Sequence, residues 1–557
     1  MTPAAARPSS LMKFKFPACL VAPLCAWSFV SAVSAQNQPP APPPAPPPVP
    51  APSGPQTDGA FHKVILEADI EVDGQLADTL KDPMELVVAP DGRVFFAQRD
   101  GTVKLIKPGA KESIVIAKLP VFTGLEDGML GITLDPKFGK NNWVYLNRSL
   151  PETTTNSVTG GKVGIIRVAR FTLKGDELDL ASETKILDVQ TQREQCCHVG
   201  GSLAFDKDGN LYISVGDNTN PFDSDGFSPS DERPGRYPWD AQRTSANANS
   251  LVGKILRVKP KAGGGYEIPK GNLFPPGTPG TRPEIYVMGN RNPFRISLDA
   301  KTGYLYWGEV GPDAGGFSEK RGPGGHDEIN QARKAGFFGW PLFVGDNKAY
   351  SRVDFNEYQA AKDARAAHDK AVKDAKAKSE PAPAKPEFPA FPKSEPKFHD
   401  PLKPLNLSPN NDGIKELPPT QPAFIYYTGS PSTRFPAVNG GGGRTAMAGP
   451  VYYFDPKNPN PNKLPKEYDR TLFIYEWSRN WIVTVKLDAQ SNIVRDAAGQ
   501  PLMAKFCPGM TFKRPMDLEL GGDGCLYLIE FGTAWGNNKD TQIVRIEFAG
   551  TQAAAAR

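Results

Sequence analysis

The sequence is poor in the residue types that most often hold haem and metal groups. Its 557 residues include only six cysteines and five histidines. There is no Cys-x-x-Cys-His segment, which excludes a c-type haem site, and no Cys-x-x-Cys pair that would indicate structural zinc. Neither a c-type haem nor a structural zinc site of this kind is therefore expected.

The chain also lacks an excess of charge of either sign. Lys and Arg number 65 and Asp and Glu number 61, so the net charge is +4. A protein that binds nucleic acid needs a dense basic face. The near balance of charge therefore argues against that class of function.

Only one stretch is strongly apolar, and it lies near the N-terminus. Residues 12–35 begin with Lys13 and Lys15 and end in an Ala-x-Ala-like site at Ala35, which is typical of a secretory signal peptide. The apolar part is shorter than the roughly 20 residues that a membrane span needs. We expect cleavage after Ala35, a periplasmic or secreted location and no membrane span in the mature chain. The alternatives are a retained membrane anchor and, less favoured, lipidation at Cys25.

Helix-breaking residues are abundant and divide the chain. Gly and Pro number 54 and 57, which disfavours a fold of long helices. We expect a signal peptide at 1–35, a Pro-rich extended spacer at 36–60, one folded domain at 61–547 and a disordered tail at 548–557. Within the domain, about 355–405 is an Ala/Lys/Asp-rich stretch and then a Pro-rich one. This pattern predicts a surface insertion made of a solvated helix and a tether.

One short pattern recurs through the predicted domain. A tight turn with Asp and Gly is followed by alternating apolar and aromatic residues, which is a β-hairpin signal. The four copies begin at Pro90, Phe205, Leu298 and Gly522. Repeated hairpins with few helices favour an all-β protein, most simply a β-propeller. The irregular spacing leaves the number of blades open, and a β-helix or tandem sandwiches compete with this interpretation.

Polar residues cluster in four segments where the predicted strands end. They are Leu125-Glu126-Asp127-Gly128 and the residues up to Pro136; Cys196-Cys197-His198-Val199-Gly200-Gly201 and on to Asp217; Gly289-Asn290-Arg291-Asn292-Pro293; and Gly311-Pro312 with Asp327-Glu328-Ile329-Asn330 and Gly339-Trp340-Pro341. Six motifs of this set occur in one order over about residues 80 to 345. In that order the chain resembles the soluble PQQ-dependent sugar dehydrogenases, the glucose/sorbosone dehydrogenase family, and most closely a divergent sorbosone-dehydrogenase-like branch.

The resemblance implies a six-bladed propeller that binds pyrroloquinoline quinone (PQQ) and Ca²⁺ and oxidises an aldose or a related sugar or polyol. His198 would be the general base, a task that suits imidazole because it titrates near neutral pH. Asp217, which follows a predicted strand 19 positions later, would fix its tautomer. Arg291 would stabilise negative charge on the reduced cofactor, and Asn292 would contact the cofactor beside it.

Further residues are assigned by the same resemblance. Arginine pairs well with the carboxylates of PQQ. Arg479 matches a basic residue of the family and Arg444 is a second candidate; each would bind the cofactor or be an exposed loop cation. Gly311 and Pro312 would ligate Ca²⁺ through their backbone carbonyls. Asp327 and Glu328 would support the metal, or would form a turn or a structural ion pair. Glu126 would lie near the substrate.

The chain also departs from the family pattern. Cys197 stands where an acidic residue precedes the histidine, Ser202 stands where a basic residue often follows the glycines, and a family lysine has no counterpart. Cys196 and Cys197 would be either a vicinal disulfide or two buried thiols. Cys507 and Cys525 could pair with each other across a hairpin. PQQ binding is therefore open on the sequence alone.

Three functions remain, in this order. The first is an exported PQQ- and calcium-dependent sugar dehydrogenase with an external electron acceptor. The second is a propeller of the same ancestry that binds carbohydrate or protein without PQQ. The third is a calcium-dependent lactonase, which would need several carboxylates around a central metal; the sequence shows no such unmatched ring.

Overall fold

The computed structural model describes residues 57–72, 75–76, 78–157, 160–224, 226–318, 321–352, 355–384, 398–534 and 536–550. The predicted signal peptide and most of the spacer lie outside these residues. The strand β1 (Thr57–Asp58) begins before the predicted end of the spacer at residue 60. In the described part of the chain, no helix is long and apolar enough to cross a membrane.

The described strands form six blades, each built around four antiparallel strands. We number the blades along the chain and give the strands from the innermost outwards. Blade 1 has β5 (Pro83–Val88), β6 (Val94–Gln98), β7 (Thr102–Ile106) and β8 (Ile114–Lys118). Blade 2 has β9 (Met129–Leu134), β10 (Trp143–Ser149), β12 (Lys162–Lys174) and β13 (Glu177–Gln192). Blade 3 has β14 (Gly200–Phe205), β15 (Leu211–Val215), β16 (Lys254–Pro260) and β18 (Ile285–Met288).

The other three blades repeat this order. Blade 4 has β19 (Pro293–Leu298), β20 (Leu305–Glu309), β21 (Asp327–Ala332) and β25 (Ile425–Tyr427). Blade 5 has β26 (Ala446–Tyr452), β27 (Thr471–Glu476), β28 (Trp481–Lys486) and β29 (Met503–Lys505). Blade 6 has β30 (Pro515–Leu520), β31 (Leu526–Glu530), β32 (Gln542–Phe548) and, from the other end of the chain, β2 (Phe61–Ala68).

Short elements complete the fold. Several two-residue strands flank the blades: β3 (Glu71–Val72), β4 (Gln75–Leu76), β11 (Thr154–Thr155), β17 (Tyr266–Glu267), β22 (Gly336–Phe337), β23 (Phe343–Val344) and β24 (Lys348–Ala349). The described α-helices are α1 (Phe138–Asn141) and α2 (Phe355–Ala377). Helix α2 occupies the stretch where the sequence predicts a solvated helix, whereas most of the Pro-rich tether lies outside the described residues.

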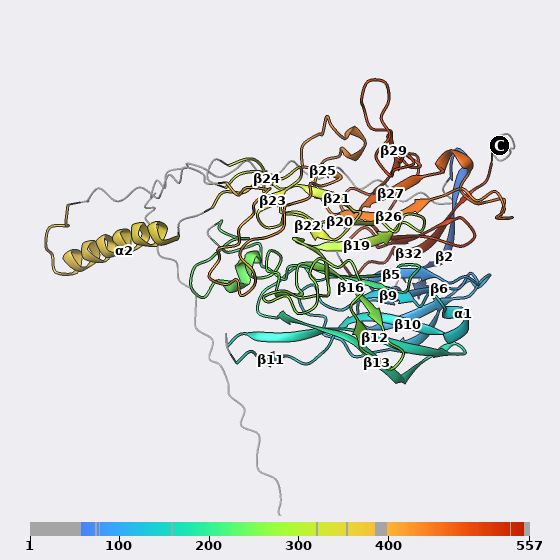
Figure 1. Ribbon diagram of the computed structural model, residues 1–557, viewed down its shortest axis with the longest axis horizontal. Helices are drawn as coiled ribbons and strands as arrows, with labels where there is room; N and C mark the ends of the chain where they lie inside the picture. The colour runs from blue at the N-terminus through green and yellow to red at the C-terminus, as the bar shows by residue number, and fades with distance from the viewer. Residues whose placement is uncertain are drawn as a thin grey trace, which may run out of the picture. The chain divides into compact units, whose positions relative to one another are not determined.

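The innermost strands close into a ring. Each one contacts the next, from β5 through β9, β14, β19, β26 and β30 and back to β5. The seam lies in blade 6, where β2 pairs antiparallel with β32; in Figure 1 the blue β2 runs beside the dark red β32. The prediction of a six-bladed all-β propeller is therefore confirmed.

The recurring turns lie where the hairpin pattern predicts them. Each joins the first and second strands of a blade, in blades 1, 3, 4 and 6. Their glycines, Gly92, Gly209, Gly303 and Gly524, have positive φ and donate their N–H back across the turn. A residue with a side chain adopts that backbone only at a cost, which explains the repeated glycine.

Apolar side chains fill the spaces between blades, and charged groups lie along the ring. The layer between blades 1 and 2, for example, includes Phe95, Ile132 and Phe171. On the innermost strands the buried Glu85 accepts hydrogen bonds from the N–H of Ile132 at 2.7 Å and of Leu203. Its pKa is raised to about 8, chiefly by burial. The blades are therefore joined by polar contacts at the centre as well as by apolar packing.

Candidate active site

The predicted site residues gather at one end of the propeller. Because the first and second strands of a blade are antiparallel, residues before a first strand lie beside residues after a second strand. Hydrogen bonds then join neighbouring blades: Asp217 N–H donates to the Arg291 carbonyl at 2.6 Å, and Gly200 N–H donates to Asn292 Oδ1 at 3.1 Å. Blades 3 and 4 thus hold the predicted base and the predicted cofactor contacts together.

His198 is oriented by a chain of hydrogen bonds. Its Nδ1 lies 2.7 Å from Asp217 Oδ1, and Asp217 Oδ2 accepts a hydrogen bond from the indole N–H of Trp340 at 2.7 Å. Asp217 is fully buried and His198 is 5% exposed. A carboxylate acceptor favours the tautomer with the proton on Nδ1, which leaves Nε2 as the basic nitrogen.

The backbone of His198 is fixed as well. Glu126 Oε2 accepts a hydrogen bond from its N–H at 2.6 Å, and the residue has a φ of +63°. Glu126 itself is exposed, so its carboxylate lies at the surface beside the histidine. Its predicted role near the substrate stays a prediction, and holding the His198 backbone is the role that its contact supports.

The two glycines after the histidine are needed for packing between strands. A Cβ on Gly201 would lie 2.4 Å from the Cβ of Leu130, and one on Gly200 would lie 2.9 Å from the backbone nitrogen of Gly216. These contacts come from blade 2 and from the residue that follows β15. They explain the glycines without a flat ligand against the backbone.

Arg291 is a buried cation with unused donors. Its Nη1 donates to the Val310 carbonyl at 2.8 Å, and the guanidinium carbon lies 5.9 Å from the centre of the Trp340 ring. No described residue accepts from its Nε or Nη2. The backbone N–H groups of Arg291 and Asn292 both donate to Glu309 Oε1. The site therefore presents a rigidly held guanidinium close to the residues that orient His198.

Buried carboxyls lie behind this guanidinium. Burial raises the pKa of Glu309 well above its usual range, and the nearby Glu328 adds to the shift. Glu309 Oε2 and both polar atoms of the Asn290 side chain are buried and have no hydrogen-bond partner among the described residues. Unpaired buried polar atoms carry a free-energy cost unless a ligand or water satisfies them. Their position next to Arg291 and Asn292 suits a polar ligand at this place.

Arg444 and Asp327 form a buried ion pair. Arg444 Nε lies 3.2 Å from Asp327 Oδ1, and the other carboxylate oxygen accepts a hydrogen bond from Ala446 N–H at 2.9 Å. Burial raises the pKa of Asp327 to about 6, although Arg444 acts against this shift. Both oxygens of Asp327 thus have protein partners, and the geometry favours the structural alternative over support of a metal.

Glu328 is similarly engaged. Its Oε1 accepts from Gly345 N–H at 2.5 Å and its Oε2 accepts from the Asn330 amide at 3.0 Å. Burial raises its pKa to about 7. For Glu328, too, the geometry favours a structural role over support of calcium.

The predicted calcium carbonyls lie next to a cation. Pro312 follows β20, and its carbonyl accepts a hydrogen bond from Arg444 Nη2 at 2.7 Å. Gly311 packs closely on the neighbouring chain, since a Cβ there would lie 1.7 Å from the His326 carbonyl oxygen. Among the described residues, no group of three or more His, Cys, Asp or Glu side chains is arranged to hold a metal ion. A calcium ion here would depend on these carbonyls and on oxygen atoms of a ligand.

Arg479 has a different environment from the one predicted. Its three side-chain nitrogens donate to the carbonyls of Gly443, Val438 and Thr428 at 2.9 to 3.0 Å. The guanidinium is therefore hydrogen-bonded to three loop segments of blades 4 and 5. Because each nitrogen already has a partner, the geometry disfavours the predicted contact with a cofactor carboxylate.

The cysteines beside the histidine form a vicinal disulfide. Cys196 and Cys197 are bonded to each other and half-buried, immediately before His198. The alternative pair is wrong, because Cys507 and Cys525 are both free and buried. Ser202, the other departure from the family pattern, is fully buried on β14 and accepts from Ile296 N–H at 3.3 Å. It lies in the wall between blades.

Two positioning residues carry no assignment from the sequence. Trp340 holds the carboxylate of Asp217, and Glu309 holds the backbone of Arg291 and Asn292. The role of Glu309 could have been inferred from a pattern in the sequence. The second strands of blades 4, 5 and 6 all end in glutamate, at Glu309, Glu476 and Glu530. Glu476 and Glu530 likewise accept hydrogen bonds from N–H groups that lead into a first strand.

Fold and site together define a six-bladed propeller protein with a histidine–carboxylate pair and a buried arginine at one end. A sequence model of the Glucose / Sorbosone dehydrogenase family matches residues 80–379. The chain belongs to this family.

Curated relatives match part of the chain. Aldose sugar dehydrogenase YliI of Escherichia coli is 28% identical over 272 residues, which cover 48% of this chain and 61% of the relative. Quinoprotein glucose dehydrogenase B of Acinetobacter calcoaceticus is 22% identical over 307 residues, which cover 54% and 57%. The matches thus span less than two thirds of each relative.

A solved structure supports the fold. The soluble aldose sugar dehydrogenase of E. coli in its apo form is 18% identical, with a TM-score of 0.51 over 88% of this chain and 99% of that one. At this identity the likeness concerns the architecture alone.

Proposed function

We propose that this protein is an exported quinoprotein oxidoreductase that oxidises an aldose or a related sugar- or polyol-derived substrate. The observation that carries the proposal is the buried hydrogen-bond chain from Trp340 through Asp217 to His198, beside the guanidinium of Arg291. Such a chain suits proton removal from a hydroxyl group. PQQ, when bound, supplies the acceptor for the hydride that leaves the sugar carbon.

The residues of this chain divide the remaining work. His198 Nε2 would take the proton of the substrate hydroxyl, because Asp217 holds the other ring nitrogen. Asp217 would stabilise the imidazolium that forms. Arg291 would hold its positive charge where negative charge develops, in a site with little water to screen it.

The cofactor would bind at the same end of the propeller. Arg291, Asn292 and Arg444 would hold PQQ, and the unpartnered atoms of Asn290 and Glu309 next to them support a polar ligand at this place. Calcium would be held by the Gly311 and Pro312 carbonyls together with oxygens of PQQ. The ion pair with Asp327 offsets the positive charge that Arg444 brings to Pro312.

The test is a titration of residues 36–557 with PQQ and Ca²⁺, followed by turnover of a panel of aldoses with a dye as electron acceptor. We expect stoichiometric PQQ binding and dye reduction. His198→Ala should abolish turnover and retain PQQ binding. The matched control is His62→Ala, a partly exposed histidine on β2 that pairs with Glu547 in blade 6.

The outcome also decides the second candidate function. Absence of PQQ binding at micromolar cofactor with calcium present would refute the dehydrogenase. The engaged guanidinium of Arg479 and the disulfide in place of an acidic side chain are the observations that would then favour a PQQ-free propeller. Such a propeller would bind carbohydrate or another protein.

A further inference from the structure

A separate cavity of about 340 Å³ lies beside the candidate active site. Its walls come from the loop between β15 and β16, the loop between β20 and β21, and the segments on either side of helix α2. All are insertions beyond the four strands of a blade. His198, Asp217 and Arg291 do not line it, so it is not the predicted reaction site itself.

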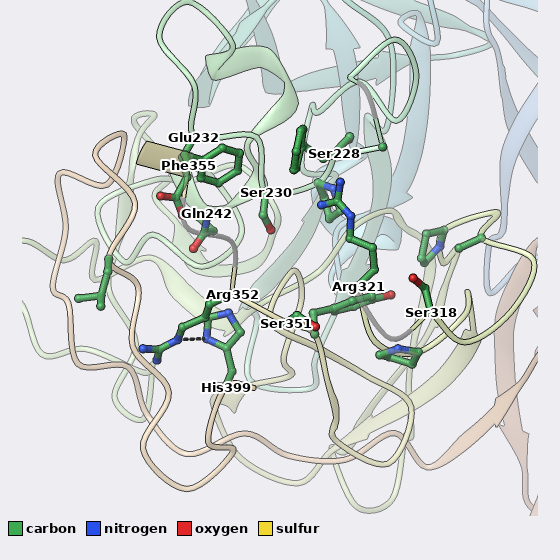
Figure 2. Close-up of a pocket in the computed structure, with 18 of the residues that line it drawn as sticks. Ser228, Ser230, Glu232, Gln242, Ser318, Arg321, Ser351, Arg352, Phe355 and His399 are labelled. Atoms are coloured by element: carbon green, nitrogen blue, oxygen red, sulfur yellow. Dashed lines mark hydrogen bonds between the residues drawn. The ribbon is translucent and has the colours of Figure 1, made fainter. Parts of the chain in front are cut away.

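Hydrogen-bonding groups cover one part of the cavity. Figure 2 shows Glu232 next to Gln242, whose amide nitrogen donates to the carboxylate at 2.8 Å. It also shows Arg352 beside His399, with Arg352 Nε donating to the imidazole Nδ1 at 3.3 Å. Each pair leaves further donor or acceptor sites for a ligand: the carboxylate has a second oxygen, and the guanidinium has two terminal nitrogens.

Two hydroxyl groups in the wall have no partner. Tyr350 Oη and Ser351 Oγ are buried and make no hydrogen bond with any described residue. Both residues line the cavity. A buried hydroxyl without a partner costs free energy, so a ligand that offers its own hydroxyl groups, or water, would relieve that cost.

Another part of the lining is apolar. Phe227 and Phe355 lie with their ring centres 5.1 Å apart, and Leu405 and Leu407 extend this surface. The guanidinium of Arg321, which also lines the cavity, lies 4.2 Å from the centre of the Phe227 ring. A cavity lined by aromatic rings and by carboxylate, amide and hydroxyl groups is suited to a ligand with apolar faces and a polar edge. A sugar ring has this character, because its C–H groups form two faces and its hydroxyls form the rim.

The cavity and the candidate active site share part of a wall. Pro312 lines it, and the carbonyl of this residue is one of the predicted calcium ligands. The Tyr350 ring lies 6.1 Å from the ring of Trp340, which holds Asp217. The cavity and the candidate active site are therefore adjacent and share residues of their walls.

We propose that this cavity is a sugar-binding subsite that holds a unit next to the one that is oxidised, so that the preferred substrate is an oligosaccharide. The substrate part of the proposal rests on the proposed function. The binding part does not, because it is tested without cofactor and with variants of Phe355 and Glu232, which lie outside the predicted cofactor site.

The binding test uses residues 36–557 without cofactor and measures the affinity for maltotriose, cellotriose and glucose by calorimetry. We expect at least one trisaccharide to bind and glucose to bind at least tenfold more weakly. Phe355→Ala and the isosteric Glu232→Gln should each lower the trisaccharide affinity about tenfold. Leu402→Ala is the matched control, since that side chain is 73% exposed and lies outside the cavity wall.

The turnover test uses the PQQ- and calcium-loaded protein. Phe355→Ala should lower kcat/KM for the bound trisaccharide about tenfold and change kcat/KM for glucose less than twofold. If neither trisaccharide binds the wild type at millimolar concentration, the subsite is refuted whatever happens to glucose. If a trisaccharide binds and no sugar is oxidised, the proposed function fails and the cavity is a sugar site without an oxidative role, which overturns the substrate part.

Discussion

The sharpest prediction concerns Asp217→Asn, because each oxygen of this carboxylate accepts a defined donor. Oδ1 accepts from Thr219 N–H at 2.9 Å and faces His198 Nδ1, and Oδ2 accepts from the Trp340 indole at 2.7 Å. An asparagine must place its NH₂ group at one of these positions. At Oδ2 it would meet the indole N–H, and at Oδ1 it would meet the Thr219 N–H.

Both orientations therefore bring two donors together. A buried polar group that loses its partner costs about 1–3 kcal/mol, so the variant should be less stable by that order. With NH₂ at Oδ1 the amide can also donate to the imidazole and shift its proton to Nε2, which would then no longer be a base. The same substitution in serine proteases lowers kcat by about 10⁴. We expect a loss of about 10²–10⁴ in kcat, or roughly 3–5 kcal/mol.

The assay is dye-coupled sugar oxidation by PQQ- and calcium-loaded protein from pH 5 to pH 9, with thermal unfolding measured in parallel. Asp176→Asn is the control, because that exposed carboxylate pairs only with the exposed Lys107. A folded variant that keeps kcat within threefold of the wild type across this range would refute the role of Asp217 in fixing the tautomer.

Four further outcomes are expected, which concern Trp340, Arg444, Glu85 and the cysteines. Trp340→Phe should lower kcat about tenfold and stability by about 1–3 kcal/mol, since Asp217 Oδ2 loses its donor; turnover equal to the wild type would contradict this. Arg444→Met should lower the free energy of unfolding in denaturant by about 3–5 kcal/mol, because it leaves the buried carboxylate of Asp327 without its cation. A decrease below 1 kcal/mol would indicate that this carboxyl is already neutral. Burial raises the pKa of Glu85 from 4.5 to about 8, so the folded state binds more protons than the unfolded state in this window and loses stability as pH rises through it; Glu85→Gln should flatten that slope. Alkylation of residues 36–557 should label no cysteine in the native protein, the two free thiols after denaturation, and the vicinal pair only after reduction.

The turns and strands could be predicted from the sequence because the residues that determine them are neighbours in the chain. The glycine turns recur at the positions where the hairpins bend, and each needs a positive φ that is visible as Asp-Gly or a similar pair. The number of blades was not accessible in this way, since the other two blades bend through different turns. It came from the resemblance of the motifs as a set.

The site was predictable where partners lie close in the chain or repeat a motif. His198 and Asp217 are separated by one hairpin, and they do lie 2.7 Å apart. Trp340 comes from a loop more than a hundred residues later, and no periodicity links it to Asp217. The contacts of Arg479 could not be predicted either, because a sequence does not show which backbone carbonyls accept hydrogen bonds from an arginine.

The cavity illustrates the same limit more strongly. Its walls combine segments near residues 230, 320, 350 and 400, each of which reads alone as a loop. The Ala/Lys/Asp-rich insertion was expected to be a solvated surface feature, and most of α2 has that composition. Its first residue, Phe355, nevertheless packs against Phe227.

The seam of blade 6 makes the ring dependent on both ends of the domain. Strand β2 has its neighbour in β32, which is made last, so the ring cannot close while the chain is still being synthesised. A chain cut before Gln542 would leave β2 and β31 with unpaired edges, and such edges are templates for association with other chains. Loss of the final strand should therefore produce aggregates and degradation products. Closure of the ring therefore requires that both ends of the domain are present.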